Sequence, residues 1–539
     1  MQATRLNTTV AAIACVVGMS VGTAALAETP QSGGTLNFVV GSKIPSYDGH
    51  RETTFGMIHP IAPFYSLLIR VNPNNPSSPT DFVCDLCVGD VPAPTDGGTK
   101  YTFNIREGVT FHDGAPLSSA DVKATYDRII FPTEGVPSSR KAFFKMVESV
   151  EAPDPTTVVF NLKFPSGAFI PALATPFNFV YSKKDLDEHG HEWHSKNVNG
   201  SGPFKFVEHH PGSHVSGQKF AGYHHEGQPY LDAFKAIAAP KMAVRLQAIR
   251  GDRAAIEFRG FPPKARDDLV NALGDKITVQ ESDWNCVLMV TPNQKRKPFD
   301  DVRVRKALTL AVDRWGGSQY LSKIAIVKTV GGVVFPNHPL AATREELENI
   351  AGYWPDLEKS RAEARRLLEE AGHSGLSFEF NNRGVDQPYK VVGTWLIDQW
   401  AKVGMKVRQR VQPTGPFYDT LRKQYDFDVS IDFNCQSVIN PLADISKFLG
   451  SAGNNYGQFE DPVLEEIYEK LIRSGDEAEQ RELVRKYELR ALDEMAHQNI
   501  TLWWYKINPH RSYVKGWEVA PSHYLNQQLD NIWIDKSLL

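Results

Sequence analysis

This 539-residue sequence has only five Cys and no large excess of either positive or negative charge, since its formal net charge is −4. The 59 Lys and Arg nearly balance the 63 Asp and Glu, and no basic run occurs, which argues against a nucleic acid as partner. Internal repeats and low-complexity tracts are also absent. Long apolar runs are confined to the amino terminus, so we expect no later stretch to span a bilayer.

The amino terminus has the composition of an export signal. Arg5 precedes an apolar run, 10–26, and Ala25-Leu26-Ala27 has the small-x-small form of a signal-peptidase site. A membrane anchor would need about 20 strongly apolar residues, and glycine and serine interrupt this run. Lipidation of Cys15 would leave only a stub of apolar sequence before it. We therefore predict a cleaved signal peptide, 1–27, and a periplasmic mature protein.

The mature chain of about 510 residues is too long for one hydrophobic core, so two or three domains are expected. Strand and helix patterns alternate along it, which indicates an α/β protein. Aromatic residues make up 11% of the sequence, and they serve both cores and the walls of ligand pockets. Strands are predicted at 33–40, 158–162, 177–181, 378–381, 406–411, 427–431 and 500–505, and helices at 243–251, 299–314, 358–370, 395–403 and 477–496.

Four cysteines remain after processing: Cys84, Cys87, Cys286 and Cys435. An even set in an oxidising compartment suggests two disulfides. Cys84 and Cys87 can close a small loop by themselves, and Cys286 would then pair with Cys435 over a long separation. A metal site at Cys84 and Cys87 would need a second pair of ligands, and none is nearby in the sequence.

The segment 101–129 predicts a strand, a turn and a capped helix. Tyr101 and Phe103 alternate with polar residues, which is the pattern of a strand with one buried face. A His-Asp-Gly turn follows, and Ser118 or Ser119 can cap the next helix, with Asp121 in its first turn.

As a string, 101–129 closely resembles the signature of extracytoplasmic solute-binding proteins of the peptide/nickel family, the capture subunits of ABC importers. The segments 199–204, 227–231 and 243–251 continue the likeness. The resemblance implies a two-lobed periplasmic-binding-protein fold of type II, with an extra subdomain in lobe I and a hinged cleft that closes around a solute. It also supports pairing of Cys286 with Cys435, since oligopeptide-binding members have a disulfide in the corresponding places.

The resemblance also divides the chain. We expect lobe I at 28–70, 196–284 and 506–539, the extra subdomain at 71–195, and lobe II at 285–505. A lobe that closes over a ligand changes the shape that the membrane permease meets, so the permease can distinguish loaded from empty protein. This role requires no bond to be broken.

Candidate ligand-binding residues come from three segments. In peptide-binding relatives an acid just after the strand of the Cys435 equivalent pairs with the peptide amine, but here that place holds Asn434, Gln436, Ser437 and Asn440. This strip suits a neutral polar ligand, because an ammonium group would lack a counter-charge. Arg383 could clamp a carboxylate or phosphate.

Tyr47 and Asp48 are added because their loop leaves the carboxyl end of the first strand. A solvated loop at 434–440 and a surface position for Arg383 are the structural alternatives.

Catalysis and metal binding find little support. The sequence has no Gly-x-Ser-x-Gly elbow, and His191 and His194 lack the spacing of a zinc-protease helix. Eight histidines between 189 and 225 are expected to be solvated, so we predict no metal site and no cofactor.

We therefore predict a monomeric, non-enzymatic binding protein that delivers a peptide or peptide-like solute to the permease and ATPase of an ABC importer. A sugar, an opine or a metal chelate such as nickel is the alternative ligand, and a secreted hydrolase the remote one.

Overall fold

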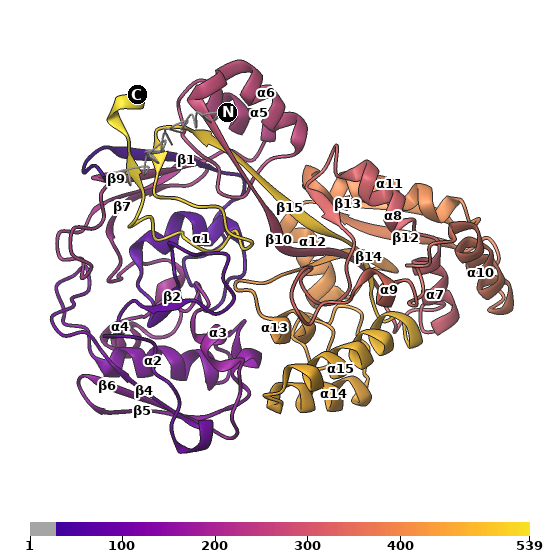
Figure 1. Cartoon of the computed structure of the whole chain (residues 1–539), viewed down its shortest axis with the longest axis horizontal. Coiled ribbons are helices and arrows are strands. Elements are labelled where there is room, and N and C mark those ends of the chain that lie inside the picture. The colour runs from indigo at the N-terminus through magenta and orange to yellow at the C-terminus, as the bar shows by residue number, and fades with distance from the viewer. Residues whose placement is uncertain (1–28) are drawn as a thin grey trace, which may run out of the picture.

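Two lobes lie side by side in the computed structural model, which describes residues 29–539 (Figure 1). The predicted signal peptide and its cleavage site lie outside the described residues. Two long strands, β10 (Ile277–Pro292) and β15 (Asn499–Arg511), run between the lobes and pair with each other antiparallel along most of their length. Among the described residues no helix is long and apolar enough to cross a membrane.

Lobe I contains a four-stranded sheet of order β1-β9-β8-β7. β1 (Thr35–Val40) pairs parallel with β9 (Ala233–Ala238), and β8 (His214–Lys219) and β7 (Phe204–His210) follow antiparallel. Its inner face packs on α1 (Phe55–Ile61) through an aromatic core.

The segment predicted as an extra subdomain forms a separate three-stranded sheet of order β4-β6-β5. Tyr101 and Phe103 are buried and Thr102 is exposed, which confirms the predicted alternation. α2 (Ser119–Ile130) begins after Ser118, which forms a capping box with Asp121. The strands are β4 (Lys100–Asn104), β5 (Val147–Asp154) and β6 (Thr157–Leu162), and a short ribbon of β2 (Ile69–Val71) and β3 (Phe82–Cys84) stands beside them.

Lobe II is built on a six-stranded mixed sheet of order β11-β15-β10-β14-β12-β13. Trp400 and Trp504 fill its apolar core. The further strands are β11 (Val327–Thr329), β12 (Ser377–Arg383), β13 (Lys406–Gln412) and β14 (Val429–Cys435), and its helices are α7 (Val302–Leu310), α8 (Arg314–Leu321), α9 (Arg344–Leu347), α10 (Leu357–Glu370), α11 (Val391–Ala401), α12 (Thr414–Asp419), α13 (Pro441–Ser446), α14 (Pro462–Arg473) and α15 (Glu477–Glu488).

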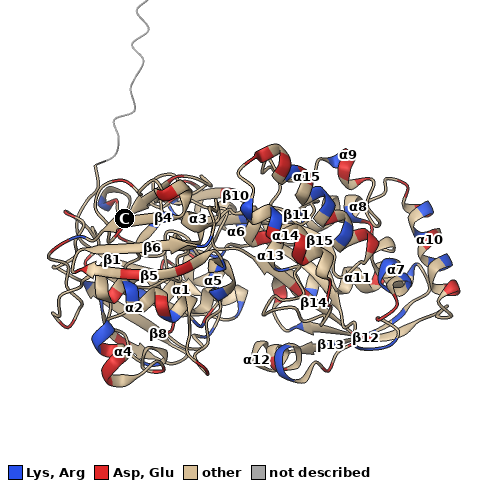
Figure 2. Ribbon diagram, turned by 90° about the horizontal axis from the view of Figure 1, so that it is seen from below, with Lys and Arg blue, Asp and Glu red and all other residues tan. Residues whose placement is uncertain are grey.

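The remaining elements belong to the first lobe and its edges. They are α3 (Phe169–Leu173), α4 (Lys183–His189), α5 (Met242–Arg250), α6 (Pro263–Leu273), β16 (Val514–Lys515) and β17 (Trp533–Ile534). Lys, Arg, Asp and Glu are scattered over the helices of both lobes (Figure 2).

Three predicted elements differ from the structure. The segment 177–181 is no strand, although Phe177, Phe179 and Tyr181 are all buried. Its backbone amides bond to the carbonyls of Thr175 and Ser66 and to the Thr125 hydroxyl, and form no ladder with a neighbouring strand. The predicted helix 299–314 is helical only at 302–310. Asp313 then caps a separate helix, α8, by accepting from the Gly316 amide at 2.8 Å. The predicted helix 477–496 is α-helical only to Glu488 and then widens into a π-turn.

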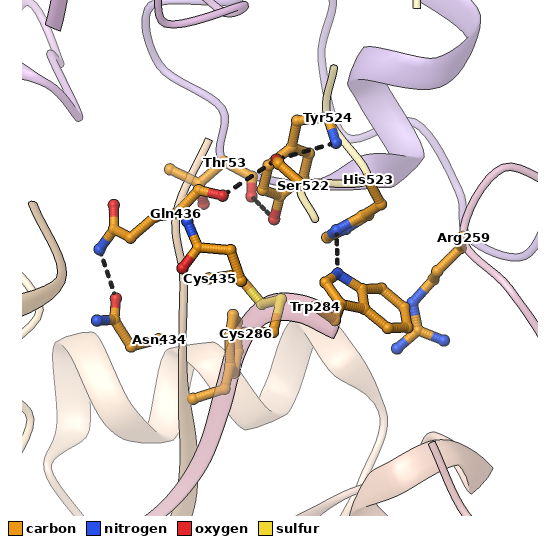
Figure 3. Close-up of a disulfide and its surroundings, with 12 residues drawn as sticks. Thr53, Arg259, Trp284, Cys286, Asn434, Cys435, Gln436, Ser522, His523 and Tyr524 are labelled. Carbon is orange, nitrogen blue, oxygen red and sulfur yellow. Dashed lines mark hydrogen bonds between the residues drawn. A yellow bond between two sulfur atoms is a disulfide. The ribbon is translucent and has the colours of Figure 1, made fainter. Parts of the chain in front are cut away.

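The crossing between the lobes lies where β10 and β15 change register. Trp284 faces Trp504, and the pairing shifts before Val287. The expected lobe boundaries at 284/285 and 505/506 fall at this point and stay a prediction. Next to it Cys286 and Cys435 are opposite each other on β10 and β14, with a Cα separation of 4.0 Å (Figure 3).

Candidate ligand-binding cleft

A cleft of about 900 Å³ lies between the lobes. Its walls come from both lobes, so a bound solute would contact both. On the lobe I side it is lined by Arg51, Glu52, Thr53, members of the segment 130–147, Lys163, Phe177 and Tyr524; on the lobe II side by Arg422, 432–437, Ser446, Lys447, Leu449, 451–454, Tyr456 and Tyr468.

The carboxyl end of β14 forms part of the lobe II wall and contains three of the predicted site residues. Gln436 donates from Nε2 to Asn434 Oδ1 at 2.7 Å (Figure 3). It also donates to the Ala443 carbonyl at 2.9 Å. Asn434 donates from Nδ2 to the Asp444 carbonyl at 2.9 Å. The nitrogens of both amides are therefore engaged within lobe II, and Ser437 lines the cleft beside them.

An acid does line the cleft at Asp432, but a lysine neutralises it. Lys447 Nζ lies 2.8 Å from Asp432 Oδ2, and both side chains are almost fully buried. Thr291 donates its hydroxyl to the same carboxylate at 3.1 Å. Since Asp432 is already paired, a peptide amine would find no free carboxylate on this wall.

Arg422 lines the cleft and was not predicted from the sequence. Its Nε donates to the Tyr456 hydroxyl at 3.3 Å, and its guanidinium lies 4.3 Å from the centre of the Tyr418 ring. Among the described residues it forms no ion pair within 4 Å, although the charge of Glu52 on the opposite wall acts on it. An unpaired guanidinium beside two phenols can bind a carboxylate through two parallel hydrogen bonds.

The loop 49–53 forms part of the lobe I wall, and Arg140 holds it in place. Arg140 donates to the carbonyls of Gly49 at 2.8 Å and Glu52 at 2.6 Å, and its guanidinium stacks 4.1 Å from the ring of Phe177. Burial raises the pKa of Glu52. The backbone of this wall is therefore fixed before a ligand arrives.

Asp48, predicted to face the ligand, instead forms a buried ion pair. Its carboxylate accepts from Arg128 at 2.6 and 3.2 Å and from the Tyr181 hydroxyl at 3.1 Å, and only 2% of the residue is exposed. Burial alone would raise the pKa of Asp48, but His50 and Arg128 lower it overall. Asp48 anchors the loop from behind and does not line the cleft.

Three further predicted site residues lie outside the lining of this cleft. Tyr47 hydrogen-bonds His209 Nδ1 through its hydroxyl at 2.5 Å and does not line the cleft. Arg383 is buried, donates to Thr414 Oγ1 at 3.2 Å and is likewise not among the lining residues. Asn440 is the N-cap of α13 and lies on a small apolar pocket adjoining the cleft.

The cleft carries an excess of positive charge. Lys and Arg outnumber Asp and Glu among its lining residues by seven to two, and one of those two acids is Asp432. Lys141, Lys145 and Lys163 supply part of the excess from the subdomain side, and all three are exposed. Such a cleft attracts anions.

The prediction that the histidines between 189 and 225 are solvated holds for only some of them. His194 is fully buried and stacks on Tyr181 with ring centres 3.8 Å apart. His224 and His225 both point at buried Asp85, at 3.1 and 2.9 Å.

Residues 90–456 match the family described as bacterial extracellular solute-binding proteins, family 5, in its middle region. The chain belongs to this family of solute-binding proteins, which confirms the resemblance seen in the sequence. Among curated relatives, it is 30% identical over 334 residues to the glutathione-binding protein GsiB of Escherichia coli K12, and 30% identical over 325 residues to that of Salmonella typhi. Each match spans 60% of this chain and 60% of the relative.

Solved structures show the same two-lobed fold. The DppA protein of Helicobacter pylori with the peptide STSA superposes with a TM-score of 0.79, covering 94% of this chain and 99% of that one at 20% identity. The AgaA protein of A. tumefaciens R10 with agropinic acid gives 0.81, covering 93% and 99% at 21% identity. The two-lobed α/β fold expected from the sequence is thereby confirmed.

Proposed function

We propose that this protein is the periplasmic solute-binding component of an ABC importer, and that it captures its solute between the lobes and presents it to the membrane permease. The observation that carries the proposal is the cleft of about 900 Å³, whose walls come from both lobes. A solute that contacts both walls stabilises the closed arrangement, so occupancy sets the lobe geometry.

The proposed ligand is a peptide or peptide-like solute with net negative charge. Its support is the excess of Lys and Arg in the cleft and the unpaired guanidinium of Arg422. The GsiB relatives are glutathione-binding proteins, and glutathione is a small acidic peptide. Arg422 would bind a ligand carboxylate, and Asn434, Gln436 and Ser437 would offer polar contacts beside it.

A non-peptide anion such as an opine is the second candidate. It is favoured by Asp432, because Lys447 already pairs with the acid that would otherwise receive a peptide amine. AgaA, which shares the fold, is described in complex with agropinic acid.

Native mass spectrometry of protein purified from the periplasm of its own host tests the proposal, because a closed cleft retains its solute. A retained acidic peptide would support the first candidate, and a single anionic non-peptide mass the second. Calorimetric titration of ligand-stripped protein with glutathione and an opine then checks affinity. Purely cationic or neutral ligands would contradict the assignment of charge.

Processing and assembly complete the proposal. We propose that the signal is cleaved after Ala27, that the protein is a monomer without catalytic activity, and that both Cys pairs are oxidised; the Cα atoms of Cys84 and Cys87 are 4.9 Å apart. The intact mass of the exported protein, with and without reduction and alkylation, tests the cleavage site and both disulfides.

A further inference from the structure

Three side chains with metal-binding atoms gather on one face of the β7–β8 hairpin of lobe I. Glu208 and His210 are two residues apart on β7, so the alternation of a strand places them on the same face. His214 on β8 is directly opposite His210 in the register. Directly opposite residues of an antiparallel pair project to the same side, so the fold itself brings Glu208, His210 and His214 together.

The donor atoms are close enough to surround one ion. Glu208 Oε2 lies 2.9 Å from His210 Nε2, and its other oxygen, Oε1, lies 2.8 Å from His214 Nε2. All the ligand atoms are within 4.8 Å of one another. A tetrahedral zinc ion with bonds of about 2.0–2.2 Å holds its ligand atoms about 3–3.6 Å apart, so small side-chain rotations suffice.

The surroundings of the cluster also fit a metal. His210 and Glu208 are 62% and 45% exposed at the side chain, which leaves an open path for an ion, while His214 is 13% exposed and fixed. Ser213 Oγ lies 2.9 Å from His214 Nδ1. When Nε2 binds a metal, Nδ1 carries the proton and donates to that hydroxyl, which orients the ring.

A second histidine–carboxylate cluster in the same lobe lacks these properties. His224 and His225 both direct Nε2 at a single oxygen, Oδ1 of Asp85, which is fully buried. Burial alone would raise the pKa of Asp85, but Arg70 and the two imidazoles hold it well below its usual value. Both imidazoles therefore share one buried carboxylate oxygen, and His224 Nδ1 is buried with no partner among residues 29–539. We interpret this cluster as a structural contact that holds the loop of His224 and His225 against Asp85.

We propose that Glu208, His210 and His214 form a surface site for a divalent first-row transition metal, for which two imidazoles and a carboxylate are the preferred donors. Zinc would take Nε2 of both rings and a carboxylate oxygen, with a water in the remaining position. None of the three residues lines the cleft, so this site is separate from the one proposed for the solute.

The test uses the mature protein, freed of metal with EDTA, and zinc chloride as the probe. Competition with a chromogenic chelator should show one zinc per chain. His214→Ala and His210→Ala should each weaken zinc binding by at least about 100-fold, because a direct ligand is lost. Glu208→Gln should weaken it by a smaller factor, since the amide oxygen is a poorer ligand.

His225→Gln is the matched control, because it alters a histidine paired with a carboxylate in the same lobe. It should bind zinc as the wild type does, and X-ray absorption of the wild-type complex should show nitrogen and oxygen neighbours from two imidazoles. Equal zinc affinity in the wild type and in the His210→Ala/His214→Ala double variant would overturn the proposal. So would a loss of binding confined to His225→Gln.

Discussion

A buried ion pair lies on each side of the cleft, and the two pairs have different roles. On lobe I, Asp48 pairs with Arg128 at 2.6 Å behind the wall, where it anchors the loop that presents Arg51 and Glu52. On lobe II, Asp432 and Lys447 pair at 2.8 Å on the wall itself. The first pair fixes the loop, whereas the second neutralises the one acid on the lobe II wall, so the positive charge of the cleft comes from the other Lys and Arg that line it.

The largest expected effect separates these roles on the lobe I side. Asp48→Asn leaves the Arg128 guanidinium buried without its counter-charge, so the free energy of unfolding should fall by about 3–5 kcal/mol. Solute affinity of the folded protein should stay within about twofold, because Asp48 does not line the cleft. Urea denaturation and calorimetric titration measure the two quantities.

Asp187→Asn is the control, since its pair with Lys183 is solvent-exposed and should contribute less than about 1 kcal/mol. A large loss of affinity in Asp48→Asn, with unchanged stability, would reverse the assignment of roles.

The next effect concerns acid. Burial lowers the pKa of His194 to about 3, so the folded protein resists protonating it while the unfolded chain accepts a proton below about pH 6.5. Because the unfolded state binds more protons between those values, His194 costs stability as the pH falls from about 6.5 toward 3.

His194→Phe keeps the stacking on Tyr181 and removes the titrating group. Its loss of unfolding free energy between pH 7 and pH 4 should be smaller than that of the wild type, by up to about 3 kcal/mol. Denaturation curves at both pH values check this, and parallel losses in the two proteins would remove His194 as a source of acid sensitivity.

A smaller effect belongs to the lobe II side. Arg422→Gln should weaken binding of the anionic solute by at least about tenfold, or 1.4 kcal/mol, and leave the melting temperature of ligand-free protein almost unchanged. Lys423→Gln is the matched control, because Lys423 is next to Arg422 in the sequence and its exposed ammonium group pairs with Asp419. Equal affinities of Arg422→Gln and Lys423→Gln would remove Arg422 from the site.

The smallest expected effect returns to lobe I. Tyr47→Phe loses the hydrogen bond to His209 and should cost about 0.5–1.5 kcal/mol of stability, with unchanged solute affinity. Thermal melts and titration test both expectations, and a Tyr47→Phe protein that binds more weakly would restore Tyr47 to the cleft.

Local chemistry explains what the sequence could predict of the fold. The alternation at Tyr101 and Phe103 and the cap at Ser118 depend on neighbours only a few residues away, so the sequence alone predicts them. The segment 177–181 has the apolar composition of a strand, but its amides bond to Ser66 and Thr125, which are far away in the sequence, and no strand forms.

The sequence predicted only part of the candidate site. The resemblance to peptide-binding relatives pointed to Asn434, Gln436 and Ser437, at and just after the end of β14, and they line the cleft. The position of Asp48 after the first strand suggested a contact with the ligand, but its carboxylate pairs with Arg128, 80 positions away, and does not line the cleft. Arg422 stands among other polar residues without a motif, so only the folded chain brings it to the cleft.

Small-angle X-ray scattering of the ligand-stripped protein, with and without the solute recovered from its host, tests the central claim most directly. A solute that contacts both walls of the cleft should draw the lobes together and reduce the radius of gyration, with a titration midpoint equal to the calorimetric dissociation constant. An unchanged radius at saturating solute would contradict capture between the lobes.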